Sequence, residues 1–271
     1  MEQKQLRSPR GIVSYWVFQN ENVDAPCIFF LHGLSADHTM FDQQVPFFSK
    51  SYSVIVWDAP AHGLSRPYAD FSYGNCAEEL RSILDEESYK TAIFVGQSMG
   101  GYVIQAFLLK YPERASVFIG IDTCPFGKQY YSKSDLFWLR QVEWMCSCFP
   151  HKTLVQSIAS SVGTTEYTRK NMEKALSVYS HRELCHLMGM GYRGFLKENA
   201  DLSISCPTYI LVGEKDKTGK VLSYSKAWHD TTGFPLTIIQ NAAHNSNTDQ
   251  PEEVNARIDR FLNNLSLKGK A

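Results

Sequence analysis

The stretch Gly96-Gln97-Ser98-Met99-Gly100-Gly101 decides how the rest of the chain is interpreted. It follows an apolar run at 92–95 that is typical of a buried strand, and residues 102–109 behind it have the pattern of a helix. G-x-S-x-G between a strand and a helix is typical of a tight turn that presents a nucleophilic serine. A helix N-terminus behind Ser98 would also aim free N–H groups at developing negative charge. The motif could belong to a plain glycine-rich loop, but its flanks favour the nucleophile.

Composition limits the function classes that need to be considered. The 271 residues carry 27 basic and 28 acidic side chains, a net charge of −1, which does not favour nucleic acid as a partner. No apolar run approaches the roughly 20 residues of a membrane span. The polar start at 1–5 lacks the apolar centre of a signal peptide, so we expect a cytoplasmic protein. The sequence does not predict the oligomeric state.

The seven cysteines are an odd number scattered along the chain, which suits a reducing compartment better than a disulfide framework. Cys146, Cys148 and His151 lie close together in sequence, but a metal site there would need a fourth ligand. Thiols in an apolar helix are the better interpretation, and we expect no metal.

Strand and helix patterns alternate along most of the chain, which predicts a mostly parallel sheet with helices on both faces. The expected strands are residues 11–18, 27–31, 54–57, 92–95, 117–121, 208–213 and 236–239, and the expected helices are 39–50, 75–87, 102–109, 220–230 and 251–265. Residues 125–199 break the alternation with aromatic-rich helical stretches such as 136–145. We therefore expect an α/β core domain formed by residues 1–124 and 200–271, with a helical cap at 125–199.

Polar residues follow several of the expected strands, where parallel sheets place their sites. They are His32, Asp58, Ser98, Asp122, Asp216 and His244. A serine nucleophile needs a base within hydrogen-bond reach, and that base needs an acceptor to fix its tautomer. Ser98, Asp216 and His244 occur in the order Ser…Asp…His. Asp122 is a rival for the carboxylate, because it also follows a strand.

The chain resembles the α/β-hydrolase superfamily over nearly its whole length. The motifs that carry the resemblance are 32–33, 58–65, 96–101, 212–216 and 243–244. The resemblance implies the α/β-hydrolase fold, with Ser98 as nucleophile, His244 as general base and then acid, and Asp216 as the orienting carboxylate. It also implies an oxyanion hole formed by the backbone N–H groups of Leu34 and Met99. His32, Asp58 and His62 would have supporting roles in loops, while His38 and the remaining histidines would be surface or cap residues.

A serine triad with a backbone oxyanion hole supports acyl transfer to water without a cofactor. The form Gly-x-Ser-Met-Gly-Gly resembles small carboxylesterases and monoacylglycerol-lipase-like enzymes, which implies a small or medium apolar ester as substrate. Phe126, Trp138 and Trp144 are candidates to bind that substrate, although they would serve equally as the core of the cap.

Several other activities use the same kind of triad. C–C bond hydrolases, thioesterases, lactonases and the lyase of menaquinone synthesis would be favoured if arginines of the cap faced the serine. Four are available: Arg140, Arg169, Arg182 and Arg193. A non-catalytic receptor is a further alternative. Dehalogenases and epoxide hydrolases of this fold need an aspartate nucleophile, and position 98 is serine.

Overall fold

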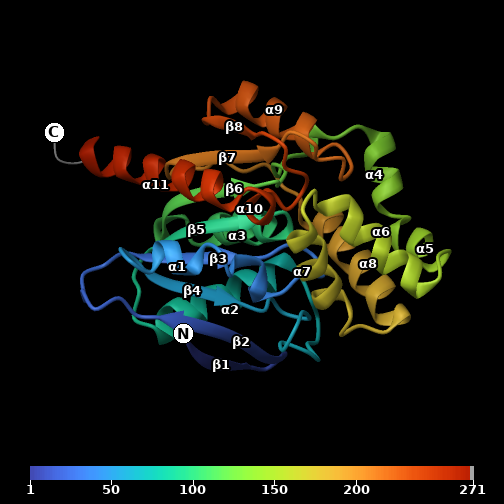
Figure 1. The fold of residues 1–271 in the computed structure, drawn as a ribbon, viewed down its shortest axis with the longest axis horizontal. Coiled ribbons are helices and arrows are strands. Elements are labelled where there is room, and N and C mark those ends of the chain that lie inside the picture. The colour runs from blue at the N-terminus through green and yellow to red at the C-terminus, as the bar shows by residue number, and fades with distance from the viewer. Residues whose placement is uncertain (269–271) are drawn as a thin grey trace.

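The computed structural model describes residues 1–268, which contain an eight-stranded sheet (Figure 1). Its strands are β1 (Glu2–Ser8), β2 (Gly11–Phe18), β3 (Cys27–Leu31), β4 (Ser53–Trp57), β5 (Ala92–Gln97), β6 (Ala115–Ile121), β7 (Thr208–Gly213) and β8 (Leu236–Ile239). They are arranged in the order β1-β2-β4-β3-β5-β6-β7-β8. β2 pairs antiparallel with β1 and β4, and all other neighbouring strands are parallel. The predicted mostly parallel sheet is confirmed.

Both faces of the central strands are buried, because successive side chains of a strand point to opposite faces. Phe29 of β3 packs on the face covered by α2 (Tyr73–Glu86), α3 (Met99–Lys110) and α9 (Val221–Thr232). Its neighbour Phe30 packs on the opposite face, together with side chains of α1 (Val45–Phe48) and α11 (Pro251–Lys268). The helices on both faces explain why the inner strands read as continuous apolar runs.

The chain between β6 and β7 forms helices, and the described residues contain no strand there. These helices are α4 (Lys133–Leu139), α5 (Val142–Ser147), α6 (His151–Val162), α7 (Glu166–Leu176) and α8 (His181–Glu198), preceded by the 3-10 helix η3 (Lys128–Tyr130). They gather beyond one end of the sheet (Figure 1). We call them the inserted helices. The division into a core domain and a cap domain stays a prediction.

Three local expectations differ from the structure. β1 was not expected, because this edge strand carries polar residues and buries only Leu6. The expected helix at 39–50 is the 3-10 helix η1 (His38–Phe41) followed by α1, since Pro46 lacks the N–H that a continuing helix needs. The helical stretch at 136–145 is split between α4 and α5. Neither glycine nor proline marks that break, so the pattern could not show it.

None of the helices that the structure describes has the length and apolar character that a membrane span requires.

Candidate active site

Ser98 lies at the turn between β5 and α3 in a strained backbone conformation. Its φ of 49° and ψ of −114° lie in a region that residues with a side chain rarely adopt. The turn packs directly against β3, because a Cβ on Gly100 would lie 2.0 Å from the carbonyl oxygen of Leu31. Only glycine fits at that position. The strained turn holds the Ser98 hydroxyl at the carboxyl end of the sheet.

Two hydrogen bonds join Ser98, His244 and Asp216. Nε2 of His244 lies 2.9 Å from Oγ of Ser98, and Nδ1 lies 2.8 Å from Oδ2 of Asp216. Asp216 follows β7, and His244 follows β8, the strand next to it. Burial lowers the pKa of His244, but the charge and hydrogen bond of Asp216 outweigh it and raise the pKa above its ordinary value. The arrangement can take a proton from the serine hydroxyl and stabilise the resulting imidazolium.

Asp122, the rival carboxylate, is fully buried at the end of β6 and makes different contacts. Its Oδ1 accepts a hydrogen bond from the backbone N–H of Gly213 at 2.7 Å, and its Oδ2 accepts one from Ser246 N–H at 2.9 Å. Burial, followed by the nearby charge of Asp216, raises the pKa of Asp122 to about 8. Asp122 therefore joins the two loops that carry Asp216 and His244, and it is Asp216 that meets the imidazole.

A third buried carboxylate, Asp249, connects the His244 loop to the inserted helices. It lies at the end of α10 (Ser246–Asp249) and accepts hydrogen bonds from the backbone N–H groups of Ala243, Thr164 and Thr165, each within 3.0 Å. On the other side of His244, the N–H of Asn245 donates to the carbonyl oxygen of Val162 at 2.8 Å. The connection between α6 and α7 is thus bonded to the backbone before and after His244. No sequence motif pointed to this contact.

The loop after β3 packs tightly against the Ser98 turn. A Cβ on Gly33 would lie 2.1 Å from Oε1 of Gln97 and 3.3 Å from Cβ of Ser98. The amide of Gln97 in turn donates to the carbonyl oxygen of His244 at 2.7 Å. Leu34 therefore lies beside the serine, and Met99 follows the serine at the N-terminus of α3.

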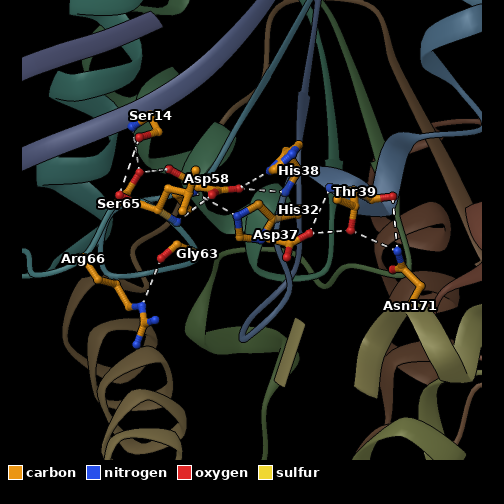
Figure 2. A network of polar contacts seen from close by, with 12 residues as sticks. Ser14, His32, Asp37, His38, Thr39, Asp58, Gly63, Ser65, Arg66 and Asn171 are labelled. Carbon is orange, nitrogen blue, oxygen red and sulfur yellow. Dashed lines mark hydrogen bonds and ion pairs between the residues drawn. The ribbon is translucent and has the colours of Figure 1, made fainter. Parts of the chain in front are cut away.

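His32 and Asp58 hold that loop in place through the turn after β4 (Figure 2). Nε2 of His32 accepts a hydrogen bond from the N–H of Ala59, so the ring proton is on Nδ1, 2.7 Å from the carbonyl oxygen of Gly33. Burial lowers the pKa of His32, which keeps the ring neutral. His32 orders the loop, as expected from the sequence.

Asp58 binds His38, a residue that the sequence did not single out. Oδ1 of Asp58 accepts from the backbone and the ring Nδ1 of His38, at 2.9 and 2.7 Å. Burial alone would raise the pKa of Asp58, but the hydrogen bond and charge of His38 outweigh it and lower the pKa. His38 also stacks on Trp16, with ring centroids 3.6 Å apart. The expectation that His38 is a surface or cap residue missed this role in the loop framework.

Comparison with known proteins now identifies the family. The model of the Alpha/beta hydrolase family matches residues 28–257. The chain belongs to the alpha/beta hydrolase family.

Similar members of this hydrolase family have low sequence identity to the chain. 3-oxoadipate enol-lactonase 2 of Acinetobacter baylyi is 23% identical over 250 residues, which cover 88% of this chain and 89% of the lactonase. A thermophilic esterase from Thermogutta terrifontis has a TM-score of 0.77 at 20% identity, covering 97% of this chain and 99% of the esterase. The N-acyl homoserine lactonase AidH has a TM-score of 0.76 at 20% identity, covering 97% of this chain and 96% of the lactonase. At these identities, the two solved structures support the hydrolase fold alone.

Two cavities of this hydrolase meet at Ser98 and His244. One, of about 90 Å³, extends between α3, α8 and α9, and we call it the tyrosine cavity after its aromatic lining of Tyr73, Tyr102, Tyr131, Tyr192, Phe195 and Tyr224. The other, of about 120 Å³, extends toward α6 and α7, and we call it the methionine cavity after Met40, Met172 and Met188. Leu34, Ser98, Tyr192, Thr218 and His244 line both.

The three aromatic residues expected to bind substrate lie outside the linings of both cavities of this hydrolase. Trp138 and Trp144 are 56% and 64% exposed, because α4 and α5 turn these side chains to solvent. Leu139, the next residue after Trp138, lines the tyrosine cavity instead. Phe126 is buried one layer behind, stacked on Tyr102 of the lining.

The four arginines of the inserted helices do not line either cavity. Arg193 pairs with Glu143, and the guanidinium of Arg169 lies 3.5 Å from the carbonyl oxygen of Gly163. Within residues 1–268, no group of histidine, cysteine or acidic side chains could hold a metal ion.

Proposed function

We propose that this alpha/beta hydrolase is a serine esterase that cleaves a small, uncharged carboxylic ester through an acyl-enzyme. The observation that carries the proposal is the hydrogen-bonded series Ser98–His244–Asp216, which has the partners and order that an activated serine needs. In this proposal Ser98 is the nucleophile, His244 the general base and acid, and Asp216 the orienting carboxylate.

Each step follows from the groups around Ser98. Oγ of Ser98 attacks the ester carbonyl carbon while Nε2 of His244 takes the hydroxyl proton. Backbone N–H groups of Leu34 and Met99 stabilise the tetrahedral oxyanion. The carbon–oxygen bond to the alcohol then breaks, and His244 gives its proton to the departing alkoxide. Water, deprotonated by His244, attacks the acyl-enzyme in the same way and releases the acid and Ser98.

The linings of the two cavities favour an ester over a substrate that carries a carboxylate. Their walls are mostly aromatic and aliphatic, and the cation among them, Lys220, already pairs with Asp135 at 2.7 Å. A lactone is a second candidate, since it is a cyclic ester open to the same attack. The enol-lactonase that is similar to this chain supports this second candidate.

Ser98→Ala tests the proposal most directly. The variant should lose about 10⁶-fold in kcat toward short aryl esters and lose labelling by a fluorophosphonate. Ser225→Ala is the matched control, because Ser225 is buried but does not line either cavity.

Turnover separates an esterase from a receptor. The wild-type protein should release many equivalents of product per active site, whereas a receptor that retains a reactive serine would stop after one. Near-normal hydrolysis by Ser98→Ala would refute the proposal.

A further inference from the structure

An ester has an acyl arm and an alcohol arm on opposite sides of the carbon that Ser98 would attack. The two cavities likewise extend from Ser98 and His244 in different directions, one toward α9 and the other toward α6 and α7. Tyr192 of α8 and Leu34 contribute to both linings, so they lie at the junction of the two cavities. Each cavity therefore provides a separate place for one arm.

The volumes limit what each arm can be. An apolar cavity of about 150 Å³ is known to hold one benzene molecule. The tyrosine cavity, at about 90 Å³, and the methionine cavity, at about 120 Å³, are both smaller. Both volumes favour a short alkyl group in each cavity over a long acyl chain or a large ring system.

Two of the tyrosines that line the tyrosine cavity have their hydroxyl groups bonded to the protein. The hydroxyl of Tyr73 donates to the carbonyl oxygen of Gly191 at 3.0 Å, and that of Tyr131 donates to Pro125 at 2.6 Å. Both side chains are buried and packed against Phe126 or Phe195. The aromatic part of this lining is fixed in shape, since aromatic rings have few rotamers and close-packed interiors resist expansion. The buried carboxyl of Asp122 lines the same cavity.

The methionine cavity has adaptable walls. Met40, Met172 and Met188 line it together with Ile158 and Val162. Its serine hydroxyls also bond to the protein, with Ser35 donating to Leu34 and Ser161 donating to Ile158. Methionine is unbranched and has several rotatable bonds, so it fits side chains and ligands of varied shape.

We propose that the two arms of the ester occupy different cavities, so that the substrate is an ester with two short apolar arms, one selected strictly by the tyrosine cavity and the other loosely by the methionine cavity. This inference rests on the proposed esterase function. Each arm of the ester should have its own size limit, and kcat/KM should fall more steeply beyond one limit than beyond the other.

Two ester series measure the limits: methyl esters from acetate to octanoate, and acetates from methyl to octyl, with acid release followed in a pH-stat. In each series kcat/KM should rise by up to roughly fourfold per methylene until the cavity is full. Beyond that point kcat/KM should fall by about tenfold or more per methylene in one series, and by a smaller factor in the other. Equal acceptance of the longest arms in both series would overturn the inference.

Two substitutions show which arm of the ester occupies which cavity. Leu139→Ala enlarges the tyrosine cavity alone, and Met188→Ala enlarges the methionine cavity alone. Each should move the size limit in one series only, and the two variants should move different series. A shift of both series by one variant, or of the same series by both variants, would contradict separate cavities.

Matched controls are Leu109→Ala and Met145→Ala, because both side chains are exposed and do not line either cavity. Neither should move a size limit. The wild-type series do not depend on how the variants fold, so the size limits remain testable if a variant is unstable. Fluorophosphonate labelling of Ser98 with hydrolysis of short esters, but without size limits, would refute this inference and leave the esterase function standing. Absence of both labelling and hydrolysis would refute the esterase function itself.

Discussion

Asp122 and Asp216 follow the neighbouring strands β6 and β7, and both are buried near His244, yet they have different partners. Both carboxylate oxygens of Asp122 accept hydrogen bonds from backbone N–H groups, those of Gly213 and Ser246. In Asp216, Oδ1 accepts a hydrogen bond from the N–H of Thr218 at 2.8 Å, and Oδ2 bonds to Nδ1 of His244. Two buried aspartates at neighbouring strand ends thus acquire different roles from the donors around them.

Position along the chain explains the different partners. Asp122 is the first residue after β6, where it has a φ of 47°, so its side chain stays between the strand ends. Asp216 lies three residues beyond the end of β7 and reaches the imidazole. Substitution of each aspartate by asparagine, which keeps the shape and removes one acceptor, tests whether the two roles differ.

The largest effect is expected for Asp216→Asn. The amide would no longer hold the proton on Nδ1 of His244. The other tautomer, with its proton on Nε2 facing Ser98, would then be favoured, and it cannot accept the serine proton. Neutralisation of a triad aspartate costs roughly 10⁴-fold in kcat. Steady-state kinetics on a short ester measure the loss, and a thermal melt checks that the variant is folded. A decrease of less than about tenfold would exclude Asp216 as the orienting carboxylate.

Asp122→Asn should cost much less, up to about 10²-fold in kcat, because it leaves the His244–Asp216 bond in place and only loosens the two loops. One of the two backbone N–H groups would face the amide NH₂ and lose its acceptor. Kinetics at the same pH as for Asp216→Asn give the comparison. If Asp122→Asn proves the more damaging change, the roles of the two carboxylates are reversed.

The pH–rate profile should show the effect of Asp216 on the pKa of His244. A general base must be neutral, so kcat/KM of the wild type should fall as the pH drops through the pKa of His244, which Asp216 raises above about 6.5. In Asp216→Asn the opposing effect of burial remains, and the acidic limb of the profile should move to lower pH. An unchanged limb would show that Asp216 does not set the pKa of His244.

The last prediction concerns stability instead of rate. With its pKa raised to about 8 by burial and by Asp216, folded Asp122 holds a proton that the unfolded chain releases near pH 4. Its contribution to stability is therefore complete below about pH 4 and is lost as the pH rises to 8. Denaturant unfolding across this range should give a flatter profile for Asp122→Asn than for the wild type. Parallel profiles would mean that Asp122 is already ionised at low pH.

Much of this arrangement could be predicted from the sequence, because it depends on local patterns. The strand–turn–helix context of Ser98 and the strand ends before Asp216 and His244 are readable in short windows. The structure brings these three residues together, and their catalytic roles remain a proposal.

The cavity linings could not be predicted in the same way. A helical pattern shows that Trp138 and Leu139 share a helix, but not which of them faces the cavity. Tyr192 carries no motif, and Asp249 acts on backbone 85 residues earlier in the chain. Contacts of that kind follow from tertiary packing, which no short window of sequence contains.

The bonds from Asp249 and Asn245 to the α6–α7 connection have a consequence for protein engineering. In this hydrolase, the inserted helices cannot be exchanged for those of a relative as an independent module. A chimaera joined at residues 125 and 199 would lose the N–H donors of Thr164 and Thr165 and the carbonyl acceptor of Val162, and the backbone around His244 would lose its outer support. We expect such a graft to succeed only when the donor's loop supplies the same three backbone groups in register with Asp249.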